Sequence, residues 1–259
     1  MESTVERLVQ HVTAVVGDQL HAVILHGSLA TGDFVPGRSD IDLLVVTGAG
    51  ITDDQAAALE RVVVAADLGD ASGVDLHVVT SVVAADPVRE PPVELHVGRY
   101  ASGVEVARRM PADPDLPVEL AMARAGGRTL LAAPLVENRS PAGVFGEVPA
   151  RWIVDRGRHW LTVWQGLTED DQHAAHMVLT ACRIWRFAVE GVHCGKVDAA
   201  RWAEGRDPGM AAIGAAIRRY TTGNHEPVAP AAIARLLDRV LTETSAVAPR
   251  GAKDGREAQ

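Results

Sequence analysis

Residues His26 to Val46 read HGSLATGDFVPGRSDIDLLVV. The stretch opens with a Gly-Ser turn after an apolar run, and it ends with Asp40 and Asp42 at the start of a second apolar run. Residues two apart on a strand point to the same face, so the two carboxylates are expected to project together. Like charges at this separation repel one another unless a cation lies between them. The stretch therefore predicts a cation site at the edge of a buried strand.

A third acid, Asp75, lies in the segment Val74–Thr80, which reads VDLHVVT. The alternation of apolar and polar residues predicts a strand on which Asp75 and His77 share a face. If this strand pairs with the strand that carries Asp42, three carboxylates come together, and three carboxylates can hold two Mg²⁺ ions for displacement at phosphorus. His77 would then orient Asp75, bind substrate, or simply lie at the surface.

The Gly27-Ser28 turn has a matching role in this prediction. It ends a predicted strand at residues 21–26 and opens a helix or a tight turn, where exposed backbone N–H groups bind phosphate and glycine permits close approach. Ser28 adds a hydroxyl donor. Each motif alone is typical of an ordinary turn or strand start, but turn, spacing, flanking strands and distant third acid agree on a phosphate-and-metal site.

The remaining pattern divides the chain into a mixed half and a helical half, with a boundary near residue 148. The 259 residues suffice for one large domain or two of ordinary size. The predicted strands span residues 21–26, 39–46 and 74–80. The predicted helices span residues 5–16, 54–66, 116–124, 151–165, 172–189, 199–202, 210–219 and 231–244. Residues 93–100 and 129–136 are short apolar segments without an assignment.

The composition of the chain limits which binding partners and which cellular compartment are expected. The net charge of -9 does not attract nucleic acid and suits a small cationic partner, although acidity also serves solubility alone. No apolar run approaches the ~20 residues that span a bilayer, and the N-terminus lacks the features of a signal peptide. Cys182 and Cys194 are expected to be reduced thiols. We expect a cytoplasmic monomer without a nucleic-acid or membrane partner.

The motifs resemble those of the nucleotidyltransferase superfamily related to DNA polymerase β, which has a GS turn, a DxD pair and a third acid on a later strand. The residues at these positions are Gly27, Ser28, Asp40, Asp42 and Asp75. The resemblance implies an α+β fold: a polymerase β-like N-terminal domain with a mixed sheet, followed by an all-α helical bundle. It also implies two Mg²⁺ ions, a nucleoside triphosphate, and Asp75 as third metal ligand or general base.

A narrower resemblance, to the aminoglycoside adenylyltransferases that modify streptomycin and spectinomycin, runs along almost the whole chain. It is carried by the segments HGS, SDIDLLVV, VDLHVVT, ELHVGRY, MVLTACRIW and AARWA. It implies ATP as co-substrate and transfer of AMP to a hydroxyl of a cationic aminocyclitol. The domains would be a nucleotidyltransferase domain at residues 1–148 and a helical domain at 149–247 that closes on nucleotide and substrate. A disordered tail is expected at residues 248–259.

The narrower resemblance also implies roles for individual residues. Those that would contact the nucleotide are Gly27, Ser28, Ser39, Arg183, Lys196 and His176. Those that would contact the acceptor are Tyr100, Trp164, Glu169, Asp170, Asp171 and His173. Three positions depart from the family pattern: Asp75 replaces a glutamate, Tyr100 replaces a tryptophan, and His173 replaces an acid that binds the cationic drug.

Alternatives remain open at this point. Glu169, Asp170 and Asp171 would either line the acceptor pocket, with one of the aspartates taking the role of the acid missing at His173, or complement the dipole of a helix capped by Thr168. The same chemistry could act on another acceptor such as a protein hydroxyl. A non-catalytic nucleotide-binding module is the third alternative, and it would be expected to lack one of the three acids.

Overall fold

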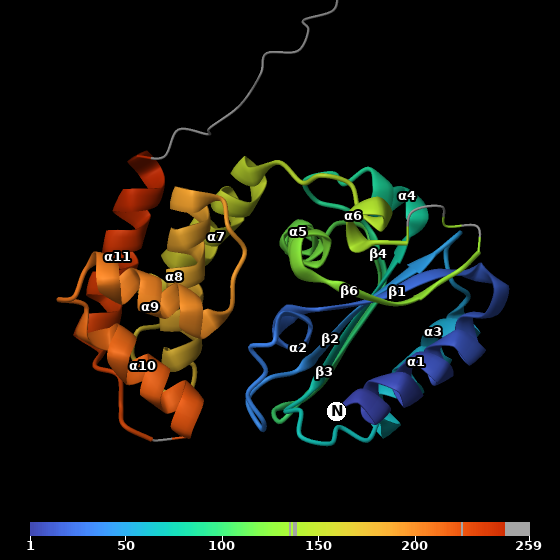
Figure 1. Ribbon diagram of the computed structural model, residues 1–259, viewed down its shortest axis with the longest axis horizontal. Coiled ribbons are helices and arrows are strands. Elements are labelled where there is room, and N and C mark those ends of the chain that lie inside the picture. The colour runs from blue at the N-terminus through green and yellow to red at the C-terminus, as the bar shows by residue number, and fades with distance from the viewer. Residues whose placement is uncertain (135, 137–138, 224, 247–259) are drawn as a thin grey trace, which may run out of the picture. The chain divides into compact units, whose positions relative to one another are not determined.

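The computed structural model describes residues 1–134, 136, 139–223 and 225–246. The chain divides into two compact units, Met1–Val148 and Pro149–Gln259 (Figure 1). The tail that was predicted to be disordered, residues 248–259, lies outside the described residues. In the part of the chain that the structure describes, no helix is both long and apolar enough to cross a membrane.

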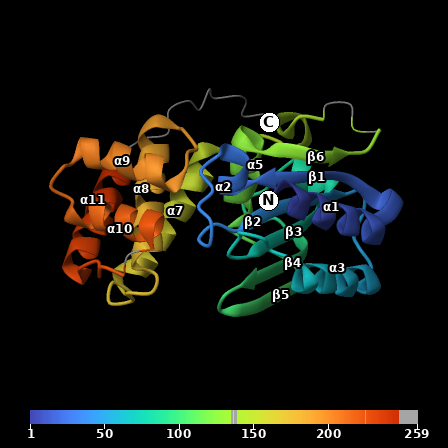
Figure 2. The ribbon, with the colours of Figure 1, turned by 60° about the horizontal axis from the view of Figure 1, so that its bottom comes forward.

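The first unit is built on a six-stranded mixed sheet with the order β5-β4-β3-β2-β1-β6. Figure 2 shows the strands in this order, with β6 at the top and β5 at the bottom. Strands β2 and β3 are parallel, and every other neighbouring pair is antiparallel. The strands are β1 (Leu20–His26), β2 (Ile41–Thr47), β3 (Val74–Thr80), β4 (Val93–Tyr100), β5 (Gly103–Met110) and β6 (Arg128–Ala132). The predicted mixed sheet is confirmed.

The two faces of the sheet differ in what covers them. Helices α1 (Glu2–Val16) and α3 (Asp53–Ala65) lie on one face (Figure 1), where they bury alternate apolar residues of the strands such as Leu43 and Leu76. The strand residues between these, including Asp42 and Asp75, therefore point to the opposite face. The alternation that buries the core thus also places the polar residues of the predicted site.

Shorter elements and one further helix complete the first unit. They are the 3-10 helix η1 (Gly17–Gln19), α2 (Gly27–Thr31), α4 (Ser81–Ala85), α5 (Leu116–Gly126) and α6 (Pro141–Val144). Helix α5 packs against β1 on the face that carries the polar residues (Figure 1). The start of α3 shows how local sequence sets an element, because Thr52 and Gln55 form a reciprocal capping box there.

The second unit is helical throughout its regular structure in the described residues. Its helices are α7 (Ala150–Gln165), α8 (Ala174–Glu190), α9 (Lys196–Arg206), α10 (Ala211–Thr222) and α11 (Pro230–Ala246). Helix α8 packs against all four of the others, and its Trp185 is fully buried in the core that they share. The predicted helical half is confirmed.

Three local expectations need correction. Strand β2 begins at Ile41, so Asp40 precedes the strand. Residues 93–100 and 103–110 form a hairpin that sequence did not predict. Helix α8 begins at Ala174 and is preceded by turns, with His173 as its N-cap, so the expected cap at Thr168 is wrong. The backbone N–H of His173 donates to Asp170 Oδ1 at 3.3 Å, which holds this turn outside the helix.

Candidate active site

The paired acids come from neighbouring parallel strands. Asp42 on β2 stands directly beside Asp75 on β3 in the pairing register, as the sequence predicted for pairing of these strands. Both side chains are half-buried and lie on the face that α1 and α3 leave uncovered. Equivalent positions on adjacent strands are about 5 Å apart, so the two carboxylates lie in one small region of the sheet.

The Gly27-Ser28 turn lies next to Asp42. Strand β1 ends at His26, which pairs with Asp42, and α2 begins at Gly27. Gly27 has φ +63°, and a Cβ at this position would overlap the Asp42 carboxylate. Glycine is therefore required here for two reasons, conformation and space. The prediction that this turn ends the strand and opens a helix is confirmed.

Asp40 and Ser39 are fixed by the loops around the start of β2. The Ser72 hydroxyl donates to Asp40 Oδ1 at 2.7 Å. Ser39 is buried, and its Oγ accepts a hydrogen bond from the backbone N–H of Val35 at 3.0 Å. Ser39 thus helps to close the loop that leads into β2.

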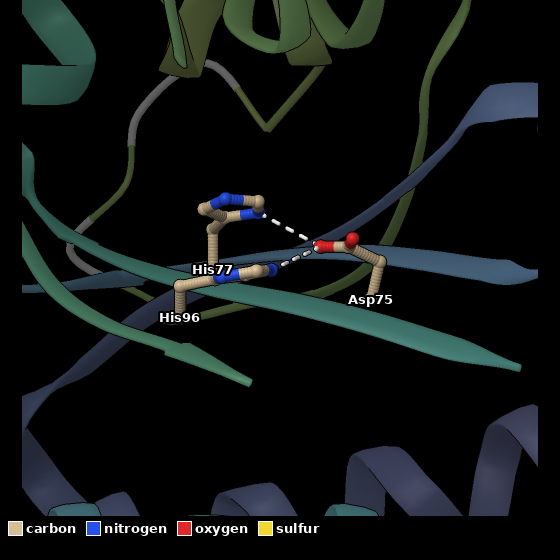
Figure 3. Close-up of side chains that lie close together, drawn as sticks. All are labelled: Asp75, His77 and His96. Carbon is tan, nitrogen blue, oxygen red and sulfur yellow. Dashed lines mark ion pairs between the residues drawn. The ribbon is translucent and has the colours of Figure 1, made fainter. Parts of the chain in front are cut away.

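Asp75 is surrounded by side chains from β3 and β4 (Figure 3). His77 Nδ1 lies 3.1 Å from Asp75 Oδ1, and His96 Nε2 lies 3.3 Å from the same oxygen. The Tyr100 hydroxyl donates to the other oxygen, Oδ2. Tyr100 reaches it because Gly98 has no side chain: a Cβ there would collide with the Tyr100 ring. Both carboxylate oxygens of Asp75 are therefore held.

These contacts shift the protonation equilibria of the site. Burial disfavours the ionised form of Asp75, but the close approach and positive charge of His77 and His96 outweigh burial and hold the pKa of this carboxyl well below its usual range. Burial also opposes the charged form of His77, yet its contact with Asp75 raises the pKa of that imidazole. Burial, and then the charge of Asp75, raises the pKa of Tyr100 far above its usual value, so the phenol remains a donor.

In the second unit, the predicted phosphate-binding residues gather near one another. His176 and Arg183 are seven residues apart on α8 and therefore share a face of that helix. Lys196 is the first residue of α9, and its Nζ lies 5.5 Å from the centroid of the Tyr220 ring. Crowding by protein and then the charges of Lys196 and Arg183 lower the pKa of His176 to about 4.

The predicted acceptor residues of the second unit form two groups. Trp164 is buried in the helical core, and its ring meets His176 edge to face with a centroid separation of 6.0 Å. The acids lie in the turns before α8, where Asp170 pairs with His173 Nδ1 at 2.7 Å and Asp171 pairs with Arg219 at 2.7 Å. Both aspartates therefore already have a partner from the chain itself, an imidazole for Asp170 and a guanidinium for Asp171.

Comparison with known proteins agrees with the two halves of the chain. Residues 10–91 match the family model described as nucleotidyltransferase domain, and residues 143–240 match the model described as aminoglycoside adenylyltransferase, C-terminal domain. Aminoglycoside (3'') (9) adenylyltransferases from Klebsiella pneumoniae, Shigella flexneri and Escherichia coli are each 31% identical over 196 residues, which is 73% of this chain and 72% of theirs. The chain belongs to the aminoglycoside adenylyltransferase family.

The fold of this adenylyltransferase agrees with a solved structure. The spectinomycin adenyltransferase AAD(9) from Enterococcus faecialis, crystallised with ATP and spectinomycin, matches with a TM-score of 0.75. The identity is 17%, and the match covers 95% of this chain and 99% of that one, so the likeness is one of fold. The predicted α+β fold with a helical C-terminal half is confirmed, as is the prediction of a nucleotidyltransferase enzyme.

The structure of this adenylyltransferase also reveals polar residues that sequence reasoning missed. His96 reaches Asp75 from a strand that was not assigned. His26, which is buried, lies with its Nδ1 3.5 Å from Glu119 of α5. The signal for His96 was present, because VELHVGRY alternates as a half-buried strand does. Nothing in the local sequence signals the approach of Glu119, since it depends on how α5 packs.

Proposed function

We propose that this adenylyltransferase transfers AMP from ATP to a hydroxyl of an aminoglycoside or aminocyclitol antibiotic, streptomycin or spectinomycin, and thereby confers resistance. The main observation in support is that Asp42 and Asp75 are paired on parallel strands beside the Gly27 turn, in a chain that belongs to this family. The acceptor hydroxyl oxygen attacks the α-phosphorus and gives up its proton to water, the bond from the α-phosphorus to the bridging oxygen of the β-phosphate breaks, and pyrophosphate leaves.

We further propose Mg²⁺ as cofactor, with two ions held by Asp40, Asp42 and Asp75. The donor set supports this, because carboxylate oxygens on a rigid scaffold are the ligands that Mg²⁺ takes alongside water and substrate phosphate. Ser72 fixes one oxygen of Asp40, and the Gly27 backbone lies against Asp42. When bound, Mg²⁺ supplies neutralisation of the charge on the triphosphate and the departing pyrophosphate.

Asp75 is better suited to holding a cation than to accepting a proton. Its pKa lies well below the usual range, and a carboxylate of such low basicity is a weak general base at neutral pH. Tyr100 and the two histidines hold the carboxylate in one orientation. We therefore assign Asp75 as a ligand rather than as the base.

Each unit has its own group of proposed nucleotide-binding residues. Gly27 and Ser28 offer backbone N–H groups and a hydroxyl beside the acids, and Ser39 supports the adjoining loop. Arg183 and Lys196 supply positive charge for phosphate, and His176 lies close enough for both charges to lower its pKa.

The acceptor contacts follow from charge and aromatic character. A drug that carries ammonium or guanidinium groups needs carboxylates, which the acids before α8 provide, and an aromatic face. Trp164 is buried in the core of the second unit, so it shapes that core and does not offer a free aromatic face. Asp170 and Asp171 must exchange their present partners, His173 and Arg219, for the drug. Glu169 has no ion-pair partner among the described residues, so it is the acid that binds a cation at least cost.

Pyrophosphate release by the pure protein tests this proposal. The protein is incubated with ATP and Mg²⁺ and with either streptomycin or spectinomycin, and mass spectrometry measures whether the mass of the drug has increased by that of an AMP group. We expect drug-dependent release that Asp40→Ala lowers by at least ~100-fold, because one oxygen ligand of the metal is lost. The matched control is Asp54→Ala on α3, an exposed acid on the opposite side of the sheet.

The outcomes separate the alternatives. Drug adenylylation in the wild type and near-normal turnover of Asp40→Ala would contradict the metal assignment. Bound ATP without drug-dependent release would move the acceptor elsewhere, and labelling of a protein by α-labelled ATP would identify a protein hydroxyl. No turnover with any acceptor would favour a nucleotide-binding module.

A further inference from the structure

We propose that Asp75, His77 and His96 form a binding site for a borderline transition-metal cation of the Zn²⁺ class, distinct from the Mg²⁺ held by oxygen ligands alone. In the described residues, this trio is the group of three potential ligands whose donor atoms all lie within 4.8 Å of one another. Asp40 and Asp42 are not part of it. The proposal concerns metal binding and does not depend on which acceptor the enzyme uses.

Strand geometry brings the three ligands together. Asp75 and His77 are two residues apart on β3 and so share a face, and His96 on β4 stands directly opposite His77 in the antiparallel register. Figure 3 shows the two imidazoles directed toward the Asp75 carboxylate. All three ligands are therefore fixed by two hydrogen-bonded strands in the interior of a sheet, which limits the rearrangement needed for binding.

The distances suit a small cation. Zinc bonds to nitrogen and oxygen at about 2.0–2.2 Å in a tetrahedral site, which places neighbouring ligand atoms about 3.4 Å apart. The observed separations from Asp75 Oδ1 are 3.1 Å to His77 and 3.3 Å to His96. The two rings are stacked at 18° with centroids 4.3 Å apart, so at least one ring must turn for both lone pairs to meet at the ion.

The donor chemistry selects the class of metal. Two imidazole nitrogens and one carboxylate suit Zn²⁺, Co²⁺ and Ni²⁺, whereas Mg²⁺ prefers oxygen ligands. A site with three protein ligands leaves a coordination position for water or a substrate oxygen. The site therefore differs in metal preference from the neighbouring carboxylates, although it shares Asp75 with them.

Two details of the surroundings support a bound cation. His96 Nε2 is buried and makes no hydrogen bond of acceptable geometry in the described structure, although it lies near Asp75. Tyr100 donates to Asp75 Oδ2, the oxygen that faces away from the histidines. A hydrogen bond to the second oxygen of a carboxylate ligand is the usual way in which proteins orient such a ligand. The exposed fractions of His77 and His96, 12% and 18%, leave the site accessible from solvent.

Cobalt titration tests the proposal without reference to catalysis. The full-length protein is stripped with a chelator and titrated with Co²⁺ in the presence of excess Mg²⁺, and visible absorption reports the coordination. We expect one Co²⁺ per chain with ligand-field bands, displaced by Zn²⁺ and not by Mg²⁺. His77→Gln and His96→Gln should each weaken binding at least tenfold, while His11→Gln, an exposed control on α1, should not change it.

Each outcome of the titration either supports or overturns the proposed metal site. Absence of ligand-field bands in the wild type would overturn the proposal whether or not the variants fold. Equal affinity of folded His77→Gln and His96→Gln, checked by circular dichroism, would place the ion elsewhere on the chain. A thermal midpoint raised by Zn²⁺ in the wild type and not in the variants would support the assignment independently.

Discussion

Asp75 receives donors on both of its carboxylate oxygens, and this sets what the residue can do. His77 and His96 share one oxygen, and Tyr100 takes the other. The arrangement holds the carboxylate ionised and oriented, which supports the proposed role of Asp75 as a ligand.

The charge of Asp75 should support the fold in a defined pH window. The pKa of Asp75 in the folded state is below the usual 3.8, so the stability that Asp75 contributes is present above pH 3.8 and is lost as the pH falls through the folded pKa. The pKa of His77 in the folded state is above the usual 6.5, so the stability that His77 contributes is present below pH 6.5 and is lost as the pH rises through the folded pKa. Asp75→Asn should therefore destabilise the chelator-treated protein most near pH 5.5, by roughly 1–3 kcal/mol.

Denaturant unfolding at pH 5.5 and pH 9 measures this difference. Asp54→Asn, an exposed acid on α3, serves as control and should change stability by a few tenths of a kcal/mol at most. An equal loss for Asp75→Asn at both pH values would mean that the contact does not depend on the ionic pair.

At the scale of elements, the sequence was sufficient to predict those helices and strands whose position is set by their own pattern of apolar and polar residues. Strand β3 was predicted to the residue, and alternation predicted which face its acid occupies; the pairing of β2 with β3 then brings Asp42 beside Asp75. The hairpin of β4 and β5 was not predicted, because β5 is an exposed edge strand and buries no apolar face of its own. Because β4 was not assigned as a strand, its antiparallel pairing with β3, which sets His96 opposite His77, could not be known.

The same limit applies to the ends of helices and to contacts between elements. One of the two interpretations left open by the sequence placed the acids in the first turn of a helix, whereas Asp170 and Asp171 are held in turns before α8 by His173 and Arg219. The pairing of Asp171 with a residue of α10 depends on packing and has no sequence signal. Residue types predicted the chemistry, and tertiary packing decided the partners.

Helix α8 gives a prediction about ATP binding. Arg183→Ala should raise the KM for ATP about 10- to 100-fold, because one charge-assisted phosphate contact is worth ~1.5–3 kcal/mol. Arg186→Ala is the matched control: it removes an arginine one turn further along the same helix that is bonded to Glu190 at 3.0 Å. Steady-state kinetics with varied ATP compare the two, and equal effects of both substitutions would argue against a specific role for Arg183.

At the scale of the whole molecule, the apolar interior is divided. One large buried cluster consists of residues 5–97 of the first unit, and the other consists of residues 161–240 of the second. The acids and the Gly27 turn belong to the first unit, and Arg183 and Lys196 belong to the second. A substitution in either core should therefore leave the polar residues of the other unit in place.

Matched core substitutions test this division. Leu25 and Leu236 are both fully buried, one in each cluster. Leu25→Ala and Leu236→Ala should each cost about 2–5 kcal/mol through lost transfer energy and the cavity left behind. Because each cluster is confined to one unit, each variant should lower a different calorimetric transition, by roughly 2–8 °C per kcal/mol for units of this size. If both variants lowered a single shared transition to the same extent, the two cores would unfold together, and the cost of a cavity in one would be borne by the entire chain.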